Sequence, residues 1–259
     1  MKIYSAFMNN PTPIEKFTEK LATLNSINVD SLGMFIKGNS GENLVKWSVS
    51  SKSKTPDLHT VPEFTIGLCH GRWATCGSVS DLNAHPIKRN STVVVHNGTI
   101  KNQEVLREKL SSAPYNKFLI TETDTEIINT LIEIYTEIGF DLLTASILST
   151  VDLKGELSFV LTDTHREVLI GFKRSFPLYL SKDEDGSYLS SDYDKTKDSY
   201  ALGDDELVVI TPTSTKLYDC TTFSEITTIN FGSVSKKKEA QAELKTFDHY
   251  TRAYVQMLK

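Results

Sequence analysis

The chain has 259 residues, of which 39% are hydrophobic and 24% are charged, and its formal net charge is −5 at pH 7. This composition is typical of a globular protein and argues against a disordered chain. The positive charges are spread along the sequence, so they do not suggest a nucleic-acid-binding face. No apolar run approaches the ~20 residues that a membrane span needs.

The three cysteines are too few, and odd in number, for a disulfide scaffold, and no Cys/His pair has metal-finger spacing. The amino-terminal residues lack the pattern of a signal peptide. We therefore expect a cytoplasmic protein, or one of the host cytoplasm if a virus encodes it. We expect no cofactor, no metal, and no binding to nucleic acid or membrane.

The first half of the chain predicts strands and two helices. Strands are expected at Lys2–Phe7, Leu32–Lys37, Phe64–His70 and Thr92–Val95. Pro13 suits the start of a helix, because Ile14, Phe17, Leu21 and Leu24 then recur at helical spacing. Asn102–Leu110 predicts a second, short helix, and Ser48–Pro56 predicts a polar loop.

The second half predicts two further helices and then a run of short strands. Thr123–Glu126 fits a capping box for a helix with Ile127, Ile128, Leu131, Ile132 and Tyr135 on one face, and Leu142–Val151 predicts the next helix. The strands are expected at Glu156–Thr162, Val168–Phe172, Leu178–Leu180, Ser187–Ser190, Leu207–Thr211 and Lys216–Tyr218. This order favours two sheets with helices packed on them over a regular βαβ fold.

Three stretches carry residues suited to chemistry. They are Gly67–Pro86 (GLCHGRWATCGSVSDLNAHP), Val95–Leu110 (VHNGTIKNQEVLREKL) and Glu122–Glu126 (ETDTE). Together they resemble the class II, N-terminal-nucleophile glutamine amidotransferases, in particular the glutamine-hydrolysing half of glucosamine-6-phosphate synthase (glutamine–fructose-6-phosphate aminotransferase). That family carries the motifs HTRWATHG, NAHP, VHNGIIxN and ETDTE in the same order.

The resemblance implies an α+β fold, the four-layer α/β/β/α sandwich with two mainly antiparallel sheets between helical layers. It assigns residues 1–235 to an amidotransferase-like domain. Residues 236–259 resemble the segment that leads into the family's sugar-isomerase half, which is absent here. The chain alone is therefore not expected to make glucosamine phosphate.

The resemblance also implies roles for individual residues. Arg72 would pair with the α-carboxylate of glutamine, and Asp124 with its α-ammonium group. Asn97 and Gly98 would form the oxyanion hole, which stabilises the negative charge that develops in the transition state. Each residue also has a structural alternative. Arg72 could form a structural ion pair, Asp124 could be a carboxylate at a helix N-terminus, and Asn97 and Gly98 could form a plain Asn-Gly turn.

Other residues are expected around the same pocket. Trp73, Thr75, Cys76 and His85 are expected to line it. His70 and His96 are expected to be structural, because each ends a predicted strand.

The sequence departs from the family at the nucleophile. Met1 occupies the position of the catalytic cysteine, and a thioether has no proton to lose. A shifted register would put Lys2 there instead. Ile27 replaces an active-site arginine of the family, and Cys76 replaces the histidine of its Trp-Ala-Thr-His motif.

Three hypotheses follow. The first, which we favour, is a stand-alone pseudoenzyme that binds L-glutamine or a similar amino acid as a binding or regulatory module. The second is an active glutaminase that uses Cys76 and donates ammonia to a partner enzyme. The third is an interaction protein that mimics the glutaminase half of an aminosugar synthase.

Overall fold

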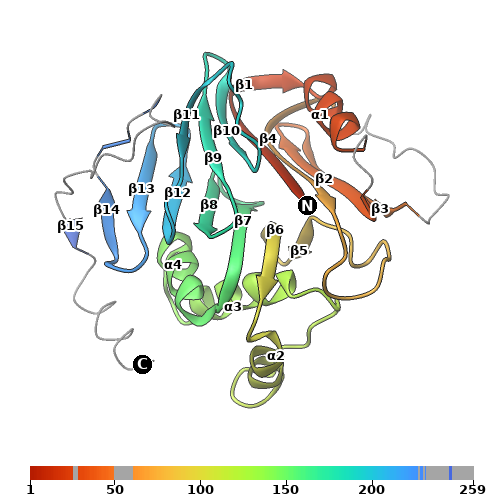
Figure 1. Cartoon of the computed structure of the whole chain (residues 1–259), viewed down its shortest axis with the longest axis vertical. Coiled ribbons are helices and arrows are strands. Elements are labelled where there is room, and N and C mark those ends of the chain that lie inside the picture. The colour runs from red at the N-terminus through yellow and green to blue at the C-terminus, as the bar shows by residue number, and fades with distance from the viewer. Residues whose placement is uncertain (26–28, 50–60, 227, 230, 232–244, 247–259) are drawn as a thin grey trace.

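The chain folds into two antiparallel sheets that face each other, with helices on the outer sides (Figure 1). The structure is a computed structural model that describes residues 1–25, 29–49, 61–226, 228–229, 231 and 245–246. The α+β sandwich predicted from the sequence is confirmed in this part of the chain.

The first sheet, sheet A, contains the beginning of the chain. Its strand order is β11–β9–β10–β1–β4–β2–β3, so β1 and β4 lie near its centre. The strands are β1 (Lys2–Pro13), β2 (Ser31–Gly38), β3 (Gly41–Ser48), β4 (Glu63–Arg72), β9 (Tyr179–Lys182), β10 (Gly186–Ser190) and β11 (Asp198–Ala201).

The second sheet, sheet B, has the order β15–β14–β13–β12–β8–β7–β6–β5. Its strands are β5 (Ile87–Arg89), β6 (Thr92–Ile100), β7 (Gly155–Asp163), β8 (Leu169–Arg174), β12 (Glu206–Ile210), β13 (Thr215–Asp219), β14 (Ser224–Ile226) and β15 (Lys245–Thr246). Strand β3 therefore forms one edge of sheet A, and β5 forms one edge of sheet B.

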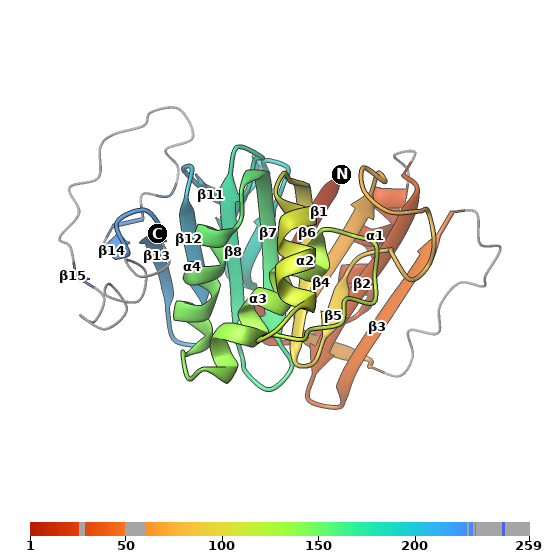
Figure 2. The ribbon, with the colours of Figure 1, turned by 90° about the horizontal axis from the view of Figure 1, so that it is seen from below.

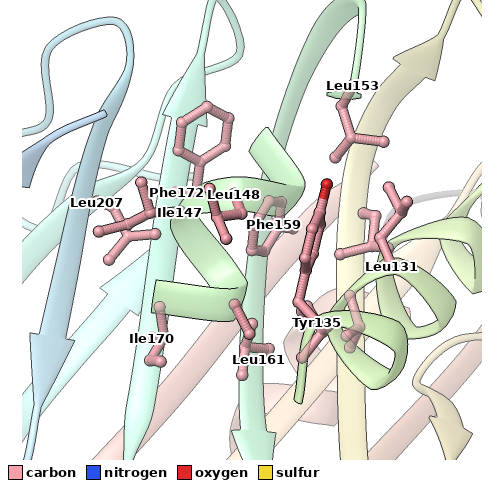
Figure 3. Packing of buried hydrophobic residues seen from close by; sticks show 14 of the residues in the cluster. Leu131, Tyr135, Ile147, Leu148, Leu153, Phe159, Leu161, Ile170, Phe172 and Leu207 are labelled. Atoms are coloured by element: carbon pink, nitrogen blue, oxygen red, sulfur yellow. The ribbon is translucent and has the colours of Figure 1, made fainter. Parts of the chain in front are cut away.

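Helices cover the outer face of each sheet (Figure 2). Sheet A carries α1 (Glu15–Asn25), whose apolar side packs on β1, β2 and β4. Sheet B carries α2 (Gln103–Ser111), α3 (Thr125–Glu137) and α4 (Leu142–Asp152). Figure 3 shows the core beneath α3 and α4, where Leu131 and Leu148 meet Phe159 and Phe172 of the sheet.

Side chains of β6 alternate between two apolar layers, one between the sheets and one beneath the helices. Val93 and Val95 belong to the apolar layer between the sheets, whereas Val94 belongs to the layer beneath the helices. Successive side chains of a strand point to opposite faces, so a run of valines predicts a strand buried on both faces. The same alternation turns Asn97 toward sheet A.

The sequence predicted the long elements closely but missed five short or polar strands among the described residues. These are β3, β5, β11, β14 and β15. β3 and β11 are rich in polar residues, and their strand conformation depends on pairing with β2 and β9. Contacts from distant parts of the chain override local propensity here.

The predicted capping box at Thr123 is wrong. Asp124 is the N-cap residue of α3, and its side chain makes no capping hydrogen bond. The Glu126 carboxylate instead accepts hydrogen bonds from the backbone N–H groups of Ile120 (3.0 Å) and Thr121 (2.6 Å). The glutamate thus organises the segment before the helix rather than its N-cap.

Two predictions fall largely outside the described residues. The polar loop after Ser48 is one, and the division at residue 235 with the following segment is the other. None of the helices in the described chain is long and apolar enough to span a membrane.

Candidate functional site

Arg72 lies at the end of β4, where it is paired with Ser31 of β2. Its side chain is 3% exposed and donates hydrogen bonds to the backbone carbonyls of Cys76 and Ser78. Within the described residues it forms no ion pair. Burial lowers the pKa of Arg72, and Asp124 is the acid that opposes this most. A buried, charged guanidinium therefore lies near a carboxylate without contacting it.

Asp124 lies directly before α3 and is also buried. Its Oδ2 accepts a hydrogen bond from the backbone N–H of Ile100 at 2.9 Å, and its Oδ1 is 3.7 Å from Nδ1 of His96. These contacts tie the start of α3 to the end of β6. They hold the Asp124 carboxylate close to the Asn97–Gly98 pair in β6.

Asn97 is oriented by a residue of the opposite sheet. Its Oδ1 lies 3.0 Å from Nε2 of His70, and both side chains are buried. Because a carbonyl oxygen only accepts, His70 carries its proton on Nε2 in this contact. The amide NH₂ group of Asn97 then has no acceptor among the residues that the structure describes, so it can donate to a ligand.

Gly98 has a backbone that only glycine fits. Its φ is +122°, and a Cβ atom would lie 2.1 Å from the carbonyl oxygen of Glu156. The predicted Asn-Gly pair therefore lies within a paired strand, not in a hairpin turn.

Three buried histidines lie behind Asn97. The rings of His70 and His85 are 4.6 Å apart, and the Thr125 hydroxyl lies 2.6 Å from Nε2 of His85 and 3.1 Å from Nδ1 of His96. Nδ1 of His70, Nδ1 of His85 and Nε2 of His96 have no hydrogen-bond partner among the described residues. Burial lowers the pKa of all three, that of His70 to about 3, so they are neutral at pH 7.

No sequence pattern predicts the contact between His70 and Asn97, because it joins two sheets. His70 and His96 lie inside β4 and β6 and do not end them. His85 is buried against His70 and Thr125. Its place in lining a ligand pocket remains a prediction.

The loop after Arg72 carries the remaining predicted residues. Trp73, 47% exposed, and Thr75 face solvent. The Cys76 thiol has two oxygen acceptors, Oε1 of Gln103 at 3.0 Å and the carbonyl of Glu122 at 3.4 Å. Both partners are acceptors, so the described contacts of this thiol include no general base.

A carboxylate that sequence reasoning missed anchors this loop. Glu122 accepts hydrogen bonds from the backbone N–H (2.7 Å) and hydroxyl (2.6 Å) of Ser78 and from Nδ2 of Asn83 (2.8 Å). These hydrogen bonds, led by the Ser78 hydroxyl, lower the pKa of Glu122 to about 2. The carboxylate stays charged at neutral pH and joins the loop to the segment before α3.

The start of β1 lies at the same end of the sandwich. Lys2 is paired with Gly71, which places Met1 level with Arg72, and both views show the N-terminus beside β6 (Figures 1 and 2). Burial lowers the pKa of the Met1 amino group to about 6. Ile27, the other predicted departure, lies outside the described residues.

Comparison with known proteins identifies the family. Residues 32–250 match the family described as glutamine amidotransferase domain. The chain is 36% identical over 160 residues to a glutamine–fructose-6-phosphate aminotransferase (isomerizing) of Clostridium acetobutylicum, which covers 59% of this chain and 26% of that protein. The enzyme of the same name from Salmonella typhimurium is 31% identical over 183 residues, 69% of this chain and 28% of that protein. The chain therefore spans about a quarter of the length of these relatives.

Solved structures support the fold. A glutamine phosphoribosylpyrophosphate amidotransferase from B. subtilis superposes with a TM-score of 0.71 at 17% identity, over 89% of this chain and 50% of that one. A glutamine aminotransferase class-II domain protein from Silicibacter pomeroyi gives a TM-score of 0.57 at 16% identity, over 85% and 99%. Together with the sequence match, this shows that the chain belongs to the class II glutamine amidotransferase family.

Proposed function

We propose that this chain binds L-glutamine, or a closely similar amino acid, beside Arg72 and Asp124. The observation that carries the proposal is a buried arginine and a buried aspartate that interact electrostatically without forming an ion pair. An α-amino acid carries a carboxylate and an ammonium group on one carbon. It would satisfy both buried charges at once, which an apolar ligand would not.

The specificity for a carboxamide is assigned to Asn97 and Gly98. With its Oδ1 accepting from His70, the Asn97 NH₂ group is free to donate to a carbonyl oxygen. Neutral His70 would keep this orientation at physiological pH. A side-chain amide of glutamine presents such a carbonyl oxygen.

We further propose that glutamine hydrolysis is impaired. The residue level with Arg72 at the start of β1 is methionine, whose thioether does not form a thioester with the substrate. The amino group of Met1, with its pKa near 6, would be mostly unprotonated at pH 7 and able to act as a base. The amino group that would act as the base is then present, but the nucleophilic thiol is missing. A protein with these features would act as a binding or regulatory module.

The relatives' names specify transfer to fructose-6-phosphate, and this chain spans about a quarter of their length. A transfer reaction that used this chain would need an acceptor site outside the described residues.

Calorimetry with L-glutamine tests the binding proposal. We expect saturable binding that Arg72→Ala weakens at least ~10-fold, because charge-assisted hydrogen bonds contribute ~1.5–3 kcal/mol. Asp124→Asn keeps an acceptor for Ile100 N–H but removes the charge, and should weaken binding similarly. Arg166→Gln, which changes an exposed arginine paired with Asp163, is the matched control and should leave affinity unchanged. Absent binding, or equal affinity in all variants, would contradict the proposal.

Ammonia and glutamate release tests the impairment. The wild-type protein, with its N-terminus verified by mass spectrometry, should release neither above background. Met1→Cys, produced behind a removable initiator methionine, should gain turnover, and adding Asn97→Ala should lower it by ~10²–10³-fold. Wild-type turnover that Cys76→Ala abolishes would instead establish Cys76 as the nucleophile.

A further inference from the structure

A pocket opens at the edge of the sandwich, and neither Arg72 nor Asp124 lines it. It has a volume of about 470 Å³ and lies between β3 and β5, with the segment that joins α2 to α3 as its third wall. Arg89 of β5 donates a hydrogen bond to the carbonyl of Phe118 at 2.9 Å, which holds this segment beside the strand. We call this site the edge pocket. Its volume is within the ~300–1,000 Å³ of typical small-molecule sites.

The lining of the edge pocket is strongly cationic. Lys46, Lys88, Arg89 and Lys117 line it together with a single carboxylate, Glu126. That carboxylate accepts hydrogen bonds from Ile120 N–H, Thr121 N–H and Arg89 Nη1. Its single negative charge leaves the four cations in excess.

Three of the four cations have carboxylate partners, but Lys46 has none in the described structure. Lys88 pairs with Glu42, Lys117 pairs with Glu133 and Glu137, and Arg89 pairs with Glu126 and Glu133. Of these acids only Glu126 lines the pocket. The excess positive charge therefore faces the cavity.

Lys46 is held with its ammonium group at the pocket. It lies in β3 opposite Gly33, and its Nζ donates to the carbonyl of Leu82 at 2.8 Å. An ammonium group has three N–H donors, so two remain for a ligand. Burial lowers the pKa of Lys46 to about 8, against the opposing effects of Glu126 and Asp81, so the group is mostly charged at pH 7.

Apolar side chains form the rim next to these cations. Leu82, Phe118 and Ile120 all line the edge pocket and are 52%, 79% and 64% exposed. Exposed large apolar residues gathered around a cavity indicate a surface that a ligand covers. A bound molecule would therefore need both an anionic head and an apolar, preferably planar, body.

We propose that the edge pocket binds a small phosphorylated molecule with a planar apolar body, its phosphate on Lys46 and its body against Phe118 and Leu82. Lysine recognises phosphate as a point charge, and the neighbouring Lys88, Arg89 and Lys117 favour a dianion over a monoanion. The proposal concerns a site distinct from that for glutamine. It does not depend on the proposed function.

Calorimetry with phenyl phosphate at low ionic strength tests this site. We expect one binding event that Lys46→Met weakens at least 10-fold. Lys182→Met, at the exposed end of β9 and outside the pocket, removes the same charge and should have no effect. No binding of phenyl phosphate, or equal affinity in Lys46→Met, would overturn the proposal.

A second variant tests the apolar wall without risk to the fold. Phe118 is mostly exposed, so Phe118→Ser should fold normally and weaken phenyl phosphate several-fold, while inorganic phosphate binds as before. Benzoate binding as tightly as phenyl phosphate would contradict the assignment of a phosphate. Asp124→Asn should keep full affinity for phenyl phosphate, so that failure of the glutamine proposal and failure of this one are distinguishable.

Discussion

At the residue scale, Gly98 is subject to two constraints, backbone strain and steric overlap, and a comparison with Gly41 separates them. Its φ of +122° disfavours any side chain, and its Cβ would also overlap the carbonyl oxygen of Glu156. Gly41 has a similar φ of +130°, but nothing lies within 4 Å of its Cβ position. A side chain at Gly98 would therefore cause both backbone strain and steric overlap, whereas a side chain at Gly41 would cause backbone strain alone.

We predict that Gly98→Ala lowers the free energy of unfolding by several kcal/mol, and Gly41→Ala by ~1 kcal/mol. The strain is common to both, so the difference measures the overlap with β7. Urea denaturation followed by circular dichroism provides the measurement. Similar losses in the two variants would show that the strand pair can open to accept a methyl group.

The motif residues show how far sequence reasoning reaches at this scale. The family's motifs predicted Arg72, Asp124, Asn97 and Gly98 as site residues. Two of these, Arg72 and Asp124, lie at the end of a strand and the start of a helix, whereas Asn97 and Gly98 lie inside β6. The partner of Asn97 could not be predicted this way. His70 is 27 residues away along the chain, and only the facing of the two sheets makes the contact.

At the element scale, the sequence pattern before α3 predicts the wrong contacts for the start of this helix. The Thr-x-x-Glu spacing predicts reciprocal capping, but Glu126 binds backbone N–H groups that precede the helix and also pairs with Arg89 of β5. The ion pair between Glu126 and Arg89, which are distant in the sequence, is favoured over a local capping contact. The predicted hydrophobic face of the helix, by contrast, is confirmed, because burial on a sheet requires that spacing.

We predict that Glu126→Gln lowers the free energy of unfolding by ~2–3 kcal/mol. The variant removes the charge of a buried carboxylate that accepts three hydrogen bonds, and it places an NH₂ group among N–H donors. Glu137→Gln removes a carboxylate near the end of the same helix that is paired with Lys117 but 55% exposed, and should cost below ~1 kcal/mol. Chemical denaturation compares the two. A loss in Glu126→Gln no larger than in Glu137→Gln would mean that the segment before α3 is held by other contacts.

At the scale of the whole molecule, the candidate site depends on both sheets. Arg72 and His70 come from sheet A, Asn97 and His96 from sheet B, and Thr125 from a helix outside sheet B. Sequence patterns predict each strand, but the side chains that meet across the gap follow from the pairing and facing of the sheets. This is why the fold class was predictable and the histidine cluster was not.

The buried histidines should make the stability of the whole fold depend on pH. An unfolded histidine has a pKa near 6.5, whereas His70 in the folded chain has one near 3 and those of His85 and His96 are also lowered. Below pH 6.5 the unfolded state therefore binds more protons, and the free energy of unfolding decreases as the pH falls. Each histidine contributes up to ~1.4 kcal/mol per pH unit in this range.

Between pH 5 and pH 6 the histidines oppose one other shifted group, Glu206, whose pKa burial raises, and the histidine variants separate the two effects. The Met1 amino group, with a folded pKa near 6 and an ordinary value of 8.0, contributes its own loss of stability mainly between pH 8 and pH 6. Glu122, with a pKa near 2, contributes only below its ordinary value of 4.5. We predict that urea denaturation shows a steep fall in stability from pH 6 to pH 5, that His96→Gln makes this fall shallower, and that His165→Gln, at an exposed position, leaves it unchanged. Constant stability across this window would mean that the cluster takes up protons without unfolding, and that the orientation of Asn97 depends on another contact.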